Sequence, residues 1–169
     1  GNLSFAGHTK VTSFSASYYN RTITINEGAC LEVTGTGRVT FGYGNTFNIK
    51  GSVNNAKEAD KSTIKPSMII PGGISITGAN DFTMNLKDAY VKVGNTSSKN
   101  SAANGTFNLN IENSIAEFTN QLTFAEPTNG MNPTFIVKLK NSVLTTATKF
   151  CVAAKQTNVT LDNSTISAS

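Results

Sequence analysis

The fold is decided by four segments of the chain, which read FTMNLKDAYVKVG (82–94), TFNLNIENSIAEFT (106–119), TFIVKLKNSVLTTAT (134–148) and TNVTLDNSTISAS (157–169). They align without gaps, and each has alternating apolar residues, then an Asp or Asn, a small residue and a second alternating run. Alternating side chains on a strand point to opposite faces, so this pattern predicts two short strands joined by a tight turn. Weaker copies begin at Thr22 and Thr46.

An anchor, the second apolar residue of each copy, gives the period of the repeat. The anchors are Ile25, Ile49, Leu86, Ile111, Leu139 and Leu161, and their spacings are 24, 37, 25, 28 and 22 residues. Such spacings are typical of one solenoid coil, and repeat architectures bury a continuous core by stacking such units. The long spacing contains the polar stretch 54–67, and we expect an inserted loop over residues 54–73.

A third apolar pair recurs between the anchors, as in Val39/Phe41 and Leu122/Phe124, so each coil has three inward-facing strands. Val, Ile and Thr total 45 residues against 8 Leu, a bias that favours strands over helices. The sequence therefore predicts an all-β parallel β-helix of about six coils and three parallel sheets. The tight hexapeptide period of a left-handed β-helix is absent from the sequence, so the right-handed form is expected.

The turn has the most specific signal. Two residues after the last four anchors stand Asp88, Asn113, Asn141 and Asn163. Asn and Asp tolerate the left-handed conformation that a sharp bend needs, so these residues are expected to form a stacked ladder at one corner. The next residue is small in all four coils, which indicates a corner without room for bulk.

These repeats over roughly residues 20–169 resemble the right-handed parallel β-helices of the pectin-lyase-like superfamily, whose short turn often has an asparagine ladder. The Thr, Asn and Ser content (23, 21 and 16 residues) also resembles adhesin-like β-helix proteins of bacterial surfaces. The resemblance implies an extracellular or cell-surface location on a bacterium. We expect one domain over 1–169 and an irregular N-terminal segment over 1–20. The expected chain is either a fragment of a longer solenoid, the favoured interpretation, or one whose last coil is a poor strand.

Composition excludes several classes of function. The net charge is only +4 and 14% of residues are charged, which argues against nucleic-acid binding. No apolar run reaches the roughly 18 residues of a membrane span. Cys30 and Cys151 are too few for a disulfide scaffold and are expected to be free thiols. With His8 as its single histidine, the chain is not expected to hold a metal or a cofactor.

The functional hypothesis is a non-catalytic surface module for adhesion or glycan binding. The inserted loop carries Lys57, Lys61 and Lys65, which suit an anionic glycan, and Tyr43 and Tyr90 are candidate sugar-stacking rings. The alternative is a carbohydrate-active enzyme, a polysaccharide lyase or glycoside hydrolase, or a fragment of one. Adjacent coils can place carboxylates such as Glu112 and Asp88 close together. Ice binding through ranked Thr-x-Thr pairs is a weaker third class, because the pairs do not recur in phase.

Overall fold

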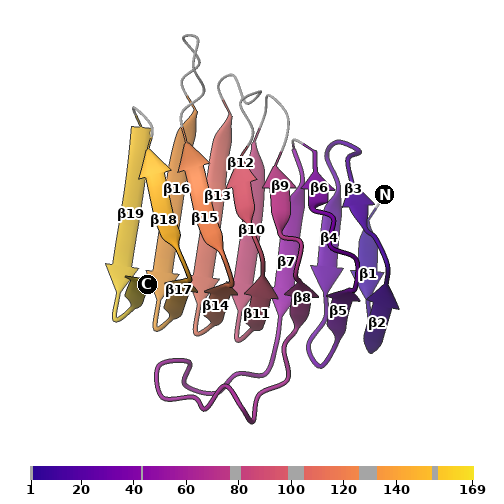
Figure 1. The fold of residues 1–169 in the computed structure, drawn as a ribbon, viewed down its shortest axis with the longest axis horizontal. Helices are drawn as coiled ribbons and strands as arrows, with labels where there is room; N and C mark the ends of the chain where they lie inside the picture. The colour runs from indigo at the N-terminus through magenta and orange to yellow at the C-terminus, as the bar shows by residue number, and fades with distance from the viewer. Residues whose placement is uncertain (1, 43, 77–80, 99–104, 126–132, 154–155) are drawn as a thin grey trace.

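The computed structural model describes residues 2–42, 44–76, 81–98, 105–125, 133–153 and 156–169. The described chain is all-β and winds as a parallel β-solenoid of three sheets, with its coils stacked along one axis (Figure 1). Sheets A and B have seven strands each and sheet C has six, so six complete coils are followed by a partial seventh. The predicted all-β fold with three parallel sheets is confirmed.

Each coil contributes one strand to each sheet in turn. Sheet A contains β1 (Leu3–Phe5), β4 (Thr22–Ile25), β7 (Thr46–Lys50), β10 (Phe82–Lys87), β13 (Thr106–Glu112), β16 (Thr134–Lys140) and β19 (Gln156–Asp162). Sheet B contains β2 (His8–Val11), β5 (Cys30–Val33), β8 (Met68–Ile70), β11 (Tyr90–Val93), β14 (Ile115–Phe118), β17 (Val143–Thr146) and β20 (Thr165–Ala168). Sheet C contains β3 (Ser15–Ala16), β6 (Val39–Phe41), β9 (Ile74–Ile76), β12 (Thr96–Ser98), β15 (Gln121–Ala125) and β18 (Lys149–Ala153).

The predicted anchors stack in one column. Strand pairing aligns Ile25 with Ile49, then in chain order with Leu86, Ile111, Leu139 and Leu161. Alternation along each strand turns these residues inward, and every anchor except the last is at most 2% exposed. The apolar columns of the three sheets thus merge into one continuous core. Ring contacts such as Phe41–Phe47, with centroids 5.0 Å apart, join sheets A and C.

The first coil corrects the prediction that residues 1–20 are irregular. β1, β2 and β3 are in register with the second coil, with Leu3 opposite Ile23, His8 opposite Cys30 and Ser15 opposite Thr40. These strands have two to four residues, too few for a visible alternation. They form because the next coil offers complete strand edges that need partners.

The inserted loop is also shorter than the predicted 54–73. It occupies residues 51–67 between β7 and β8. β8 begins at Met68, and both Met68 and Ile70 are fully buried in the core. Met68 and Ile70 pair in register with the inward-facing Val91 and Val93 of the next coil. The sequence did not show this alignment, because the insertion shifts the spacing of the repeat.

The predicted corner conformation is confirmed. Asp88, Asn113, Asn141 and Asn163 have φ values of 51°, 42°, 49° and 44°. Asn113 Nδ2 donates to Asp88 Oδ1 at 2.8 Å, and Asn163 Nδ2 donates to Asn141 Oδ1 at 2.9 Å. No such bond joins Asn113 to Asn141 among the hydrogen bonds of the described residues, so the ladder consists of two pairs. The amide of Asn113 instead bonds the inserted loop.

A serine row lies beside this ladder. The backbone N–H groups of Ala89, Ser114 and Ser142 donate to Ser114 Oγ, Ser142 Oγ and Ser164 Oγ of the following coils at 2.9, 3.0 and 3.0 Å. Each hydroxyl donates in turn to the carbonyl two residues before it, at 2.6 to 2.7 Å. The small residues predicted for steric reasons therefore also satisfy the backbone of the bend.

The two end coils leave parts of the core columns in contact with solvent. Leu3 is 44% exposed in the first coil, while Val159 and Leu161 are 41% and 48% exposed in the last. No helix in the described part of the chain has the length and apolar character to cross a membrane. Cys30 and Cys151 are both free thiols, as predicted.

Candidate functional site

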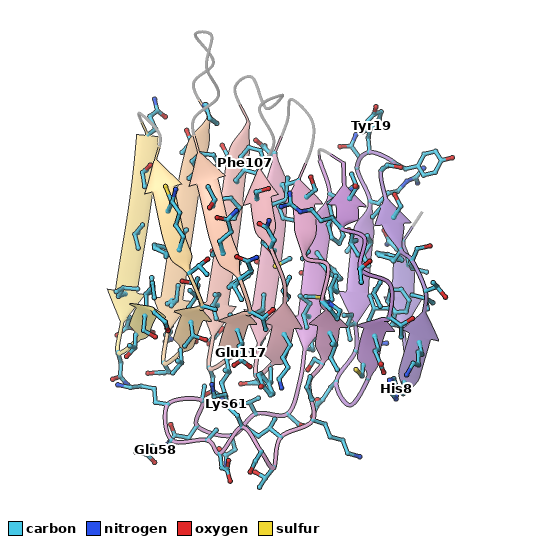
Figure 2. All side chains as sticks on the ribbon, in the orientation of Figure 1. His8, Tyr19, Glu58, Lys61, Phe107 and Glu117 are labelled. Carbon is cyan, nitrogen blue, oxygen red and sulfur yellow. The ribbon has the colours of Figure 1, made fainter. Side chains whose placement is uncertain are left out.

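The inserted loop lies on the outer face of sheet B, where it crosses several coils (Figures 1 and 2). Backbone hydrogen bonds fix its start, since Val53 N donates to Asp88 O at 2.7 Å. Asn113 then holds the next turn, because its Oδ1 accepts from Ala56 N at 3.1 Å and its Nδ2 donates to Val53 O at 3.0 Å. A corner residue thus anchors a loop that is about 60 residues away in sequence.

Tyr90 is buried under this loop. Tyr90 and Ile115 point away from the solenoid core, because the next residues, Val91 and Ala116, face into it, but Tyr90 and Ile115 are each only 2% exposed. Val53 and Ala56 of the loop cover them, and Ala59 and Ile64 pack at the edge of this second, smaller apolar cluster. The expectation that Tyr90 offers an exposed ring to a sugar is therefore wrong. Tyr90 and Ile115 instead form the apolar surface that receives the loop.

A polar network closes the far side of the loop. Tyr90 donates from its hydroxyl to Glu117 Oε2 at 2.7 Å, and Lys61 Nζ lies 3.5 Å from Glu117 Oε1. Figure 2 shows Lys61 of the loop beside Glu117 of β14. The net pKa of Glu117 is below its usual value. Burial alone would raise this pKa, but the hydrogen bond from Tyr90 and the positive charges of Lys61 and Lys92 outweigh the effect of burial. Burial, together with the bond to Glu117 and its negative charge, raises the pKa of Tyr90.

The lowered pKa of Glu117 predicts how the stability of the protein changes with pH. A carboxyl whose pKa falls on folding stabilises the folded state above its unfolded value, near 4.5, and that contribution disappears as the pH falls through the folded value. We expect Glu117→Gln to unfold at lower urea concentration than the parent at pH 6, and this difference to shrink at pH 3. Glu27→Gln, at an exposed turn, is the control. A difference for Glu117→Gln that is equal at both pH values would contradict the assignment.

The predicted site residues are not brought together. Lys57 Nζ donates to Asn163 Oδ1 at 2.8 Å, so Lys57 and Lys61 both attach the loop to the solenoid. Lys65 lies at the other end of the loop, beside β2 and β5, and has no hydrogen bond or ion pair with the described residues. Tyr43 lies outside the described residues. Glycan contact by these lysines stays a prediction.

The outer face of sheet A has a different surface of uncharged polar side chains. Strand register aligns Asn48, Asn85 and Asn110, and their amides form a row in which each Nδ2 donates to the preceding Oδ1 at 2.9 Å. The parallel row on the same strands contains Thr22, Thr46, Thr83 and Asn108. All of these side chains are half-buried by their neighbours. The arrangement is a flat field of hydroxyl and amide groups at strand spacing.

Charged residues border this field at the corner. Lys50, Lys87, Glu112, Lys140 and Asp162 are consecutive in register, and all are exposed. A shallow hollow of about 320 Å³ lies over the last three of these strands. Glu112 and Asp162 are separated by the strand of Lys140, which places their backbones about 10 Å apart. Glu112 lies opposite Lys87 in the strand register, and Asp88 accepts a hydrogen bond from Asn113 in the ladder.

A third feature lies between the base of the loop and the second coil. There a cavity of about 220 Å³ is lined by Lys65, His8, Cys30, Ser52 and Ser67, among others. His8 Nε2 and Lys10 Nζ both lie within 3.0 Å of Glu32 in this region. Hydrogen bonds from Lys10 and then His8 lower the pKa of Glu32, while burial and the charge of Glu32 raise the pKa of the Cys30 thiol.

Two of these features were missing from the sequence interpretation. The amide row was visible in the aligned repeats, because Asn48, Asn85 and Asn110 all stand one residue before an anchor. The cavity had no such signal, since Ser67 is the last residue of the insertion and His8 precedes the first recognised copy. Among the described residues, no group of three His, Cys, Asp or Glu side chains is placed to hold a metal ion.

Comparison of the chain with protein-family models, curated proteins and solved structures gave no match. The functional argument therefore rests on the surfaces described above.

Proposed function

We propose that the chain is a non-catalytic, extracellular or cell-surface β-solenoid module, of bacterial origin, that binds glycans through the outer face of sheet A. The observation that carries the proposal is the hydrogen-bonded amide row of Asn48, Asn85 and Asn110 beside a row of threonines. The row holds its amides in fixed orientations, so little side-chain entropy is lost when a ligand binds. The resemblance to adhesin-like β-helix proteins supports the same function and location.

The geometry of this face suits an extended polysaccharide. Neighbouring amides are one strand apart, about 4.8 Å, and the threonine row lies two residues along each strand, about 6.6 Å away. Asn85 both donates and accepts in the row, whereas Asn48 only accepts and Asn110 only donates. The remaining donor and acceptor sites of these amides can bind sugar hydroxyls. A chain of sugars lying along the solenoid axis would meet the same groups at each coil.

A glycan array tests the proposal. We expect the parent chain to bind at least one class of polysaccharide, and Asn85→Arg, which places a bulky charge at the centre of the row, to weaken that binding at least about tenfold. Thr145→Arg is the matched control, since Thr145 faces outward on sheet B. Both variants should keep the parent's circular dichroism spectrum. Absence of glycan binding by the parent, or equal binding by the two variants, would contradict the proposal.

A carbohydrate-active enzyme is the second candidate, and the spacing of Glu112 and Asp162 favours it. Inverting glycosidases hold their two carboxyl groups about 6.5–9.5 Å apart, near the separation expected across one intervening strand. Both side chains are exposed, however, whereas a general acid usually needs a buried carboxyl with a raised pKa. Release of reducing ends from a bound polysaccharide, lost in Glu112→Gln, would favour the enzyme over the binding module.

A further inference from the structure

The inserted loop contacts a coil that does not neighbour its own coil in the sheets. The loop leaves the third coil at the end of β7 and returns to it at β8. The strands of the third coil pair with those of the second and fourth coils, whereas β13 and β14 of the fifth coil lie one strand further along. In a solenoid whose coils contact only their neighbours, one coil can open without disturbing a distant one. The loop adds a contact of longer range to this arrangement.

The backbone attaches both ends of the loop to the fourth coil. Near its start, Val53 N donates to Asp88 O at 2.7 Å. At its end, Ser67 N donates to Tyr90 O at 2.7 Å. Gly51 allows the chain to pass this close, because a Cβ atom at residue 51 would collide with the backbone of the fourth coil. The ends of the loop therefore do not depend on the fifth coil.

The middle of the loop is held by the fifth coil. Asn113 accepts a hydrogen bond from Ala56 N at 3.1 Å and donates one to Val53 O at 3.0 Å. Ile115 of the same coil packs against Val53 and Ala56, and these three side chains are 2–5% exposed. Buried hydrogen bonds and apolar contacts of this kind contribute more to stability than contacts in solvent. The third coil is thus joined directly to the fifth by a buried contact.

Two further contacts of the loop lie closer to solvent. Lys61 Nζ is 3.5 Å from Glu117 Oε1 of the fifth coil, and the two side chains are 47% and 26% exposed. Lys57 Nζ donates to Asn163 Oδ1 of the seventh coil at 2.8 Å, also at the surface. Exposed pairs of charged or polar groups contribute little to stability. The buried contact around Ala56 is therefore the main attachment of the loop.

From this arrangement we infer that the docked loop is a conformational device that couples the third coil to the fifth. The fifth coil opens to solvent only when the middle of the loop leaves Asn113 and Ile115. Fraying that begins in the last coils consequently stops before the fifth coil while the loop is docked. The coupling acts on sheet B and does not depend on the proposed glycan contact of sheet A.

Native-state hydrogen exchange of the ¹⁵N-labelled chain, followed by NMR, tests the coupling, because it measures how readily each part of a fold opens. Ala56→Arg places a bulky charge at a residue that is 3% exposed beneath the loop. We expect this variant to raise the exchange rates of the β13 and β14 amides at least about tenfold and those of β7 by less than about threefold. Trypsin cleavage after Lys57 or Lys61 should also become faster, which reports that the loop has left sheet B. Ala147→Arg, at an exposed turn outside the loop, is the matched control and should keep the parent's rates in all three strands.

Several outcomes would overturn the inference. Unchanged exchange in β13 and β14 while the loop is cleaved faster would show that docking does not protect the fifth coil. A rise of the same size in β7 would show that the loop stabilises the whole solenoid without coupling particular coils. A loop that stays resistant to trypsin in Ala56→Arg would show that the buried contact is not its main attachment. Equal effects of Ala147→Arg on β13 and β14 would attribute the change to added charge alone.

Discussion

Asn113→Val should lower the free energy of unfolding by about 4 kcal/mol. Asn113 has a φ of 42°, a conformation in which a β-branched residue is strained by about 1–3 kcal/mol. The substitution also removes the partners of Ala56 N, Val53 O and Asp88 Oδ1, and unsatisfied buried groups cost about 1–3 kcal/mol each where water cannot replace the partner. Urea unfolding followed by circular dichroism measures the difference.

The control for this prediction lies in the same part of the chain. Asn108→Val changes an outward-facing residue in the middle of β13, whose side-chain amide makes one long bond, of 3.4 Å to Thr83, with the described residues. Valine is favoured in β-strands, so Asn108→Val should lower the free energy of unfolding by less than about 1 kcal/mol. Equal midpoints for the two variants would mean that the corner residue neither needs its left-handed conformation nor holds the loop.

Asn113 shows why the conformation of the corner could be predicted from the sequence but the docking of the inserted loop could not. Asp88, Asn113, Asn141 and Asn163 recur at one offset from the anchors, and their positive φ follows from the local bend alone. That Asn113 bonds Val53 and Ala56 depends on where a loop about 60 residues earlier comes to rest, and no local signal contains this information. The sequence therefore predicted the backbone of the ladder but not the break between Asn113 and Asn141.

Tyr90 shows the same limit for the candidate site. Alternation correctly placed its side chain on the outer face of sheet B, together with Ile115. Whether an outward apolar residue meets solvent depends on what packs over it, and here Val53 and Ala56 of the loop do so. The surroundings of the loop lysines depend on the same docking. Lys57 and Lys61 gain partners on the solenoid, whereas Lys65 lies at the base of the loop without a partner among the described residues.

The position of the loop also separates the surfaces available for binding. Tyr90 and Ile115 on the outer face of sheet B are covered by the loop, whereas no described segment covers the Asn and Thr rows of sheet A, which are half-buried by their neighbours.

Ser142→Ala should lower the free energy of unfolding by about 2 kcal/mol, although it removes a single oxygen atom. Ser142 is fully buried, accepts from Ser114 N at 3.0 Å and donates to Lys140 O at 2.6 Å. Alanine fills nearly the same space, so the loss comes mainly from Ser114 N, which is left buried without a partner at a cost of about 1–3 kcal/mol, while Lys140 O keeps its bond from Asn113 N at 2.9 Å.

The control for Ser142→Ala is the same substitution in the same row. Ser164→Ala removes equivalent bonds in the last coil, where Ser164 is only half-buried and water can reach the freed groups. Its effect on the free energy of unfolding should stay below about 1 kcal/mol. If the two variants unfold at the same urea concentration, the serine row only keeps the corner small and does not satisfy its backbone, as the sequence pattern alone had indicated.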